Sequence, residues 1–199
     1  MNDLVDALAR RDGQALLACA RERLAGVLRS VTGRLYSASD PEKWQAVWGI
    51  GALFGDRHLV SEERAIDLLR RFFWALNDES GAVPYGVPEA IGEILAVRPE
   101  LQQTFLSLLC AHLTEEDMVQ TGPIERGLIW ALGRVGPPVA PCGPGAVEAI
   151  RCAAGSHPDP ETRATAAWAL VRIRRPVDTE PTQSGRATAR GPMDAEGPG

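Results

Sequence analysis

Lysine, histidine and cysteine are scarce in this sequence of 199 residues, and their scarcity limits the chemistry it can perform. Lys43 is the only lysine, and the four cysteines include no Cys-x-x-Cys pair of the kind found in zinc sites and dithiol oxidoreductases. The three histidines stand alone, with no His-Glu dyad and no second histidine four residues away. A Gly-x-Ser-x-Gly elbow and a phosphate-binding Gly-rich loop are also missing. We therefore expect no metal and no cofactor, and the sequence favours a protein that is not an enzyme.

Long apolar runs are missing as well. No segment approaches the roughly 18 uncharged apolar residues that a membrane span needs. The N-terminal segment MNDLVDALARRDGQ is charged throughout and lacks the apolar stretch of a signal peptide. The sequence therefore predicts a cytoplasmic protein that does not cross a membrane.

An excess of positive charge is absent too, since the formal net charge is −5. Residues 56–125 carry thirteen carboxylates against five arginines, and this acidic middle would repel nucleic-acid phosphates. Residues 10–34 carry six arginines against Asp12 and Glu22. That basic stretch could face an acidic partner or could be a solvated helix face. We expect nucleic acid not to be a partner.

What the sequence does contain is an internal repeat. Gly51, Gly92 and Gly133 follow one another at intervals of 41 residues, within the similar segments WGIGAL, EAIGEI and WALGRV. A fourth copy, WALVRI, follows 38 residues later with Val171 in the glycine position. Each copy follows a proline that can begin a helix, and these prolines are Pro41, Pro88, Pro123 and Pro160. In the openings DPEKWQAVW and DPETRATAAW, aspartate can cap the helix and glutamate suits its positive end.

Second amphipathic helices are predicted between the copies. The segments SEERAIDLLRRFFWAL, PELQQTFLSLLCAHL and PGAVEAIRCAA place apolar residues on one helical stripe. Trp48, Trp130 and Trp168 occupy the same position of the repeat, so we expect them in the core. No run alternates polar with β-branched residues, and we predict no strands.

The repeat resembles a known class. DPETRATAAWALVRI is similar to the HEAT-like repeat of phycobilisome bilin lyases, with Asp-Pro, then Arg163, small residues and an apolar helix. The resemblance covers residues 40–174 and implies a solenoid of stacked helical pairs, but it does not imply lyase activity. WALNDESGAVPYGVPEAIGEI further resembles a group of bacterial HEAT-like proteins of unassigned function.

The predicted fold is all-α, a right-handed HEAT/armadillo-like α-solenoid of about three and a half helical-pair repeats with an N-terminal capping helix. Residues 1–175 are expected to form a single domain, with the capping helix at 1–36. The repeats should begin near residues 40, 86, 122 and 159. Residues 176–199 have almost no large apolar side chain, and we predict that they are a disordered tail.

The segment from Trp74 to Ile94 carries the candidate site, an acidic corner at residues 77–93. Its carboxylates could converge on a partner or a cation, or one of them could act as a general acid. The corner could equally be a joint, in which Asn77 ends one helix and Glu89 suits the start of the next. Trp74 precedes the corner and is the tryptophan that we expect to be most exposed. The candidate binding residues are Trp74, Asn77, Asp78, Glu79, Tyr85, Glu89 and Glu93.

The predicted function is that of a non-catalytic protein-binding adaptor or scaffold. It would bind a macromolecular partner, expected to be a protein, through the concave face of the solenoid and the acidic corner. Such a role could serve the assembly or maturation of an enzyme complex. The alternative is a lyase-like or cofactor-handling protein that uses the same corner.

Overall fold

The computed structural model describes residues 2–77, 84–115 and 122–174, and every regular element in these residues is a helix. The predicted all-α solenoid is therefore confirmed. Asp78 and Glu79 of the acidic corner lie outside the described residues, and so does the predicted tail at 176–199.

The N-terminal part of the chain forms two helices. α1 (Asn2–Arg10) is followed by α2 (Gly13–Arg34), whose first turn is capped by Asp12 through a hydrogen bond from the backbone N–H of Ala15 at 3.0 Å. α2 is kinked at Arg23, where the backbone leaves helical geometry with φ −153° and ψ 63°. The segment expected as a capping helix thus contains two helices, of which α2 packs on the next helix of the chain.

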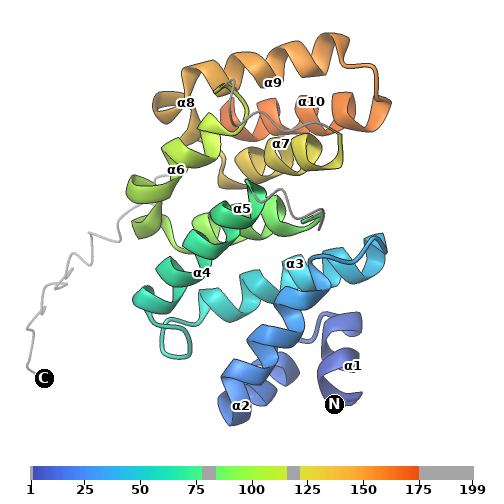
Figure 1. The fold of residues 1–199 in the computed structure, drawn as a ribbon, viewed down its shortest axis with the longest axis vertical. Coiled ribbons are helices and arrows are strands. Elements are labelled where there is room, and N and C mark those ends of the chain that lie inside the picture. The colour runs from blue at the N-terminus through green and yellow to red at the C-terminus, as the bar shows by residue number, and fades with distance from the viewer. Residues whose placement is uncertain (1, 78–83, 116–121, 175–199) are drawn as a thin grey trace, which may run out of the picture.

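Four helices pack side by side and form what we call the row (Figure 1). They are α3 (Asp40–Gly55), α5 (Val87–Val97), α7 (Pro123–Val135) and α10 (Pro160–Arg174). Each has a proline in its first turn, as the sequence predicts, because proline is compatible with the N-terminal positions of a helix. Each helix of the row thus packs on the next one.

The repeated glycine is the point at which each helix of the row meets the next. A Cβ atom on Gly92 in α5 would lie 2.6 Å from the Cα of Ala131 in α7. One on Gly133 in α7 would lie 2.8 Å from the Cα of Ala169 in α10. Both distances are shorter than a carbon–carbon contact allows, so only glycine permits this approach. The 41-residue period of the sequence is therefore the period of the row.

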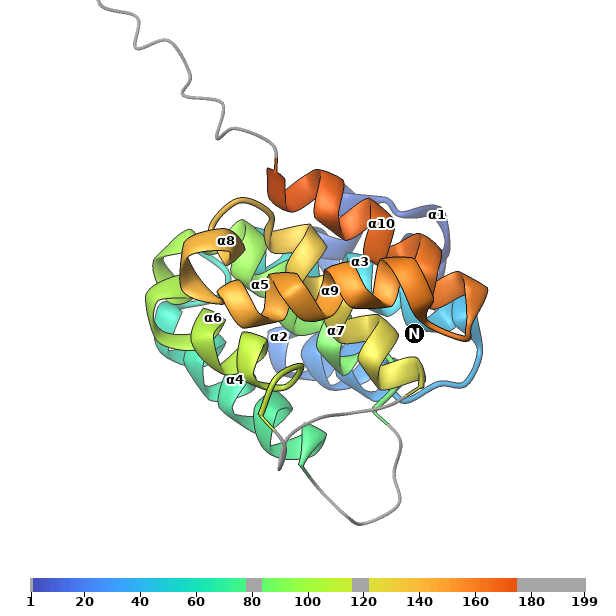
Figure 2. The same cartoon turned by 90° about the horizontal axis from the view of Figure 1, so that it is seen from above.

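The remaining helices lie beside the row or at its end (Figure 1 and Figure 2). α4 (Glu62–Leu76) packs on α5, and α6 (Gln102–Ala111) follows the 3-10 turn η1 (Pro99–Leu101). α8 (Val139–Cys142) contacts α6, and α9 (Pro144–Ser156) packs on α10. None of the helices in the described ranges has the length and apolar character that a bilayer crossing requires.

A buried arginine holds the joint between α3 and α4. Arg98 is 2% exposed, and its guanidinium donates to the carbonyl oxygens of Phe54 at 3.2 Å and Val60 at 3.0 Å. Its Nε donates to Glu100 at 2.7 Å. The carbonyl of Phe54 lies in the last turn of α3, where such groups lack partners within the helix, and that of Val60 lies in the loop that follows. Arg98 thereby attaches this turn to the end of α5.

Candidate functional site

Three tryptophans follow one another along the exposed face of the row. The rings of Trp44 in α3 and Trp130 in α7 meet edge to face with centroids 5.0 Å apart. Trp130 stacks on Trp168 in α10 at 5.9 Å. Trp168 is 38% exposed, and Trp48 and Trp130 are only partly buried. The expectation that Trp168 is a core residue is therefore wrong, whereas Trp48 and Trp130 pack against the core as partly buried side chains.

α5 has a glutamate where its neighbours in the row have tryptophan. Glu89 precedes Gly92 by three residues, the position that Trp130 has relative to Gly133. Its side chain is buried, and Oε1 lies 3.7 Å from Nζ of Lys43 in α3. On the other side the carboxyl group lies over Gly127 of α7, where a Cβ atom would be 2.8 Å from Oε2. Glu89 is thus enclosed between α3 and α7.

The carboxyl group of Glu89 is incompletely paired. Its Oε2 atom is buried and has no hydrogen-bond partner among the described residues. Burial raises the pKa of Glu89 to about 7, because loss of hydration penalises the carboxylate more than the charges of Lys43 and Arg126 stabilise it. Near neutral pH the group therefore exists in both its charged and its neutral form.

A cavity of about 180 Å³ opens beside Glu89 and spans α3, α5, α7 and α10. Trp44 and Trp130 provide its aromatic wall, and its polar lining holds two cationic and three carboxyl side chains. We call it the charged cavity. Its lining residues are Asp40, Lys43, Trp44, Glu89, Arg126, Trp130, Glu161 and Thr165.

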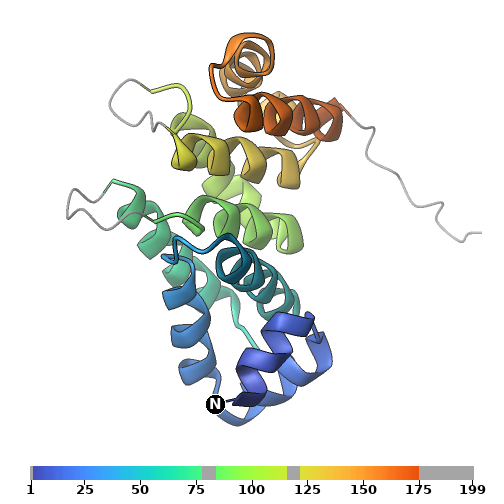
Figure 3. The same cartoon turned by 90° about the vertical axis from the view of Figure 1, so that its right-hand side faces the viewer.

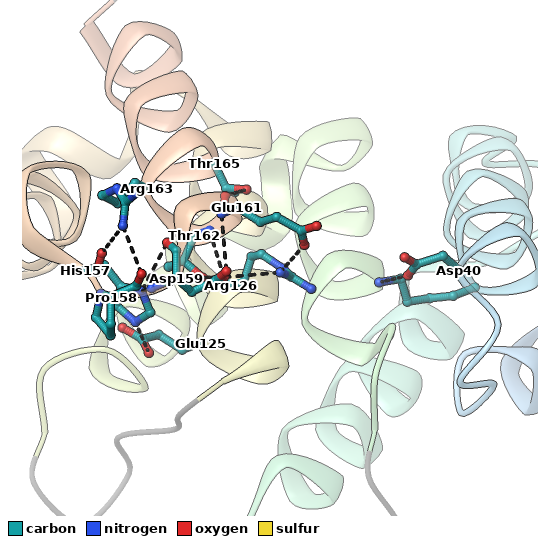
Figure 4. Close-up of polar contacts among 11 residues, drawn as sticks. Asp40, Glu125, Arg126, His157, Pro158, Asp159, Glu161, Thr162, Arg163 and Thr165 are labelled. Carbon is teal, nitrogen blue, oxygen red and sulfur yellow. Dashed lines mark hydrogen bonds and ion pairs between the residues drawn. The ribbon is translucent and has the colours of Figure 1, made fainter.

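Exposed carboxylates hold the two cations at the mouth of the charged cavity. The Nζ atom of Lys43 lies 2.9 Å from Asp40, and this hydrogen bond lowers the pKa of the Asp40 carboxyl. Arg126 contacts Glu161 and lies 3.3 Å from Asp159 (Figure 4). The side chains of Asp40 and Glu161 are 73% and 74% exposed. Both carboxylates therefore remain accessible to a partner.

The two similar openings DPEK and DPET have different roles. Asp159 precedes α10 and accepts hydrogen bonds from the hydroxyl of Thr162 at 2.6 Å and from its backbone N–H at 3.0 Å (Figure 4). These bonds lower the pKa of Asp159, and they are the cap that the sequence predicts. Asp40 instead lies inside α3, whose N-cap residue is Ser39, and its side chain turns to Lys43. One motif thus supplies a cap in one repeat and a cavity wall in the other.

The predicted site residues that the structure describes are spread over two places. Trp74 is 70% exposed near the end of α4, and Asn77 ends that helix with its side chain donating to the carbonyl of Phe73 at 3.4 Å. Tyr85 is partly buried just before α5. Asp78 and Glu79 lie outside the described residues. A binding role for these five residues stays a prediction.

Glu89 and Glu93 share one face of α5, but that face is turned into the row. Glu93 pairs with Arg134 of α7 at 2.9 and 3.2 Å, and its carboxylate fits against Gly51 of α3. Glu89 is paired with Lys43, as described above. Each carboxylate therefore bridges α3 and α7 instead of standing free at the acidic corner.

Sequence reasoning missed Lys43 and Arg126. The repeat pattern did indicate the site, because Glu89 stands at a position that tryptophan occupies in the other copies. The isolated lysine was a second signal. Within the described ranges, no three histidine, cysteine, aspartate or glutamate side chains gather so that they could hold a metal ion.

Helical pairs stacked with this period define a helical repeat protein of the armadillo/HEAT-like class. Among solved structures the fold is similar to the designed armadillo repeat protein YIII(Dq.V1)4CPAF in complex with peptide (KR)4, with a TM-score of 0.51 and 19% sequence identity. The match covers 81% of this chain and 69% of that one. At this identity the likeness concerns the fold alone. No family model matches the sequence, and no significant match was found among curated proteins.

Proposed function

We propose that this protein is a non-catalytic adaptor that binds an extended segment of a partner protein along the exposed face of the row. A basic side chain of that segment would occupy the charged cavity. The observation that carries the proposal is the Glu89 carboxyl, whose Oε2 atom is buried without a hydrogen-bond partner among the described residues. A buried acceptor without a donor is costly, and a ligand that brings a donor would remove that cost.

The surroundings of Glu89 favour a basic ligand. The lining of the charged cavity holds three carboxyl groups against two cations, and Asp40 and Glu161 are exposed at its mouth. Aromatic faces attract cations, and Nζ of Lys43 already lies 5.0 Å from the centroid of the Trp44 ring. A guanidinium or ammonium group entering the cavity would find the same combination of ring face and carboxylate.

The structural neighbour supports a peptide ligand. It is described in complex with the peptide (KR)4, a basic segment. A solenoid of this kind suits an extended chain because its helices repeat at a regular interval along one surface. The neighbour's peptide is therefore a natural first probe for this protein.

The proposed adaptor also has a proposed role in a larger assembly. We propose that the bound partner belongs to an enzyme complex whose assembly or maturation the adaptor serves, and that the acidic corner at 77–93 extends the binding surface. The resemblance to the HEAT-like repeats of bilin lyases fits this role, since such repeats bind proteins. The alternative lyase-like or cofactor-handling function needs a pocket that unites Tyr85 with Glu89. The charged cavity beside Glu89 is lined without Tyr85.

Fluorescence anisotropy with labelled (KR)4 tests the proposal. The double variant Asp40→Asn/Glu161→Gln should bind about tenfold more weakly, since a charge-assisted hydrogen bond contributes about 1.5 kcal/mol or more. The control Glu22→Gln/Glu148→Gln removes the same charge from exposed positions on α2 and α9 and should bind like the parent. Glu89→Gln should remove the rise in affinity that ionisation of Glu89 produces as the pH passes about 7.

Equal affinity of the two double variants would contradict binding at the charged cavity. Asp78→Ala/Glu79→Ala tests the acidic corner separately. That variant should weaken capture of partners from a lysate of the source organism while changing the stability of the free protein by no more than about 1 kcal/mol.

A further inference from the structure

A cleft lies between α2 and α4, away from the charged cavity. Figure 3 shows the second half of α2 (blue) and α4 (teal) on the same side of α3. Two adjoining cavities of about 260 and 310 Å³ separate the two helices. Their linings share Arg29 and Thr32 from α2 and Leu68 and Arg71 from α4, so they form one continuous cleft.

The floor of the cleft is apolar. Phe54, Leu68 and Phe72 line it and are each less than a tenth exposed, and Leu28 closes it from the side of α2. Because Phe54, Leu68 and Phe72 are already covered, the apolar surface that remains for a ligand is that of the partly buried Leu28. Leu28 offers hydrophobic contact to a ligand with apolar side chains.

The rim of the cleft is positively charged. Arg29, Arg64 and Arg71 line it and are exposed, and neither cavity is lined by a carboxylate. Within the described ranges none of the three forms an ion pair, and the Nε atom of Arg71 donates to the carbonyl of Asp67 at 3.3 Å. Elsewhere arginines do find carboxylates, as Arg57 finds Glu100 at 2.9 Å. The charge at the rim is therefore not compensated by an ion pair in the described part of the chain.

We propose that this cleft is a second binding site, which takes an acidic, partly apolar segment of a partner protein. Carboxylates of the segment would bind the three guanidinium groups, and its apolar side chains would cover the floor. Trp74 extends the surface, because it lies three residues after Arg71 on α4 and is 70% exposed. The two sites of the protein thus select opposite charges.

The combination of floor and rim distinguishes a peptide from a nucleic acid. A phosphate backbone would use the arginines but would make no apolar contact with the partly buried Leu28 or the exposed Trp74. The net charge of −5 also opposes long-range attraction of nucleic acid. An amphipathic acidic segment satisfies both parts of the cleft.

Two fluorescein-labelled peptides test the proposal with the full chain. The first is a repeat of Glu-Leu-Leu-Glu, and the second carries glutamine in place of every glutamate. The acidic peptide should bind the parent protein, and Arg29→Gln/Arg71→Gln should weaken it about tenfold, since each lost guanidinium removes a charge-assisted hydrogen bond. The glutamine peptide should bind about tenfold more weakly to the parent, for the same reason.

The matched control is Arg10→Gln/Arg70→Gln. It removes the same charge from exposed positions of α1 and α4 that do not line the cleft, and it should bind the acidic peptide like the parent. Circular dichroism and the melting temperature establish that both double variants remain folded. Binding of (KR)4 should be the same in Arg29→Gln/Arg71→Gln and in the parent, so failure of one site is distinguishable from failure of the other.

Three results would overturn the proposal. The first is no binding of the acidic peptide even at low salt, where attraction between charges is strongest. The second is an equal loss in the control variant, which would place the peptide elsewhere. The third is equally tight binding of a labelled single-stranded oligonucleotide that Arg29→Gln/Arg71→Gln also weakens, because the cleft would then be a site for phosphate.

Discussion

The row and the cleft between α2 and α4 differ in how closely their helices approach and in how their charges are matched. In the row, Gly92 brings α5 against the backbone of α7, and carboxylates bridge neighbouring helices. At the cleft, cavities separate α2 from α4, and Arg29 and Arg71 meet no carboxylate in the described ranges.

The comparison shows how packing distance and charge are connected in this protein. Where helices touch, each buried charge must be paired with an opposite charge, because burial removes its hydration. Where helices stay apart, water can solvate the guanidinium groups and pairing is not required. Unpaired charge at the surface therefore marks a site that is available to a partner, while Glu89 is a buried carboxyl group of the row whose pairing is incomplete.

Substitution of Gly92, a repeated glycine of the row, should have the largest effect on stability. Gly92→Ala places a Cβ atom 2.6 Å from the Cα of Ala131, and the backbone must move to admit it. We expect the free energy of unfolding to fall by about 3 kcal/mol or more, as measured by urea denaturation. Gly26→Ala in α2 is the control, because a Cβ atom there meets nothing within 4 Å and alanine favours the helix by about 1 kcal/mol. Equal effects at the two glycines would contradict the close packing of the row.

The second effect concerns the pH dependence of stability. The pKa of Glu89 is raised from 4.5 to about 7 in the folded protein, so between these values the folded state binds more protons than the unfolded state. The contribution of Glu89 to stability is therefore present below about pH 4.5 and is lost as the pH rises to about 7, by about 3 kcal/mol in total.

Glu89→Gln removes this titration. The variant should become more stable relative to the parent as the pH rises from about 5 to 8. Glu148→Gln, at an exposed position of α9, should follow the profile of the parent. Thermal melts across this pH range measure the difference, and a constant difference between Glu89→Gln and the parent would show that Glu89 does not change its charge there.

Arg126→Gln should have a smaller effect on stability. It removes the contacts with Asp159 and Glu161, whose side chains are 40% and 74% exposed, so solvent screening limits the loss to about 1 kcal/mol. The charge of Arg126 also lowers the pKa of Glu89. Without it, the pH at which the Glu89 contribution is lost should move upward, and an unchanged or lower midpoint would contradict the electrostatic link.

The smallest effect on stability is expected from substitution of an arginine at the cleft. Arg29→Gln removes an exposed guanidinium that has no ion pair with any residue the structure describes, so the free energy of unfolding should change by less than about 0.5 kcal/mol. A loss as large as that of Arg126→Gln would show that Arg29 supports the fold. The difference in stability loss between Arg126→Gln and Arg29→Gln therefore distinguishes an arginine held in ion pairs from one that is open to a partner.

Local patterns predicted much of the fold. Proline at the helix starts and glycine at a 41-residue period identified the helices of the row, because those residues act through backbone geometry that depends on near neighbours. Trp168 was misplaced. Repetition shows that Trp48, Trp130 and Trp168 share a role, but it does not tell which side of the helix is covered, and Trp168 proves to be 38% exposed.

The candidate site was less accessible to sequence reasoning. The four-residue spacing correctly placed Glu89 and Glu93 on one face of α5. Their partners Lys43 and Arg134 lie far away in the chain, and no local pattern indicates which helix will lie opposite. The same holds for the cleft, whose arginines come from two helices that are separated by α3 in the sequence.

The sequence by itself determined the helices, their starting residues and the period at which they stack, because propensity, capping and the absence of a side chain at glycine are local properties. Only the tertiary structure decided that Glu89 is buried between α3 and α7, and that its Oε2 atom and the guanidinium groups of Arg29 and Arg71 have no partner side chain among the described residues. Burial and charge pairing depend on which surfaces meet, and residues distant in the chain determine those surfaces. The features proposed to bind partners are therefore the ones that the sequence could not show.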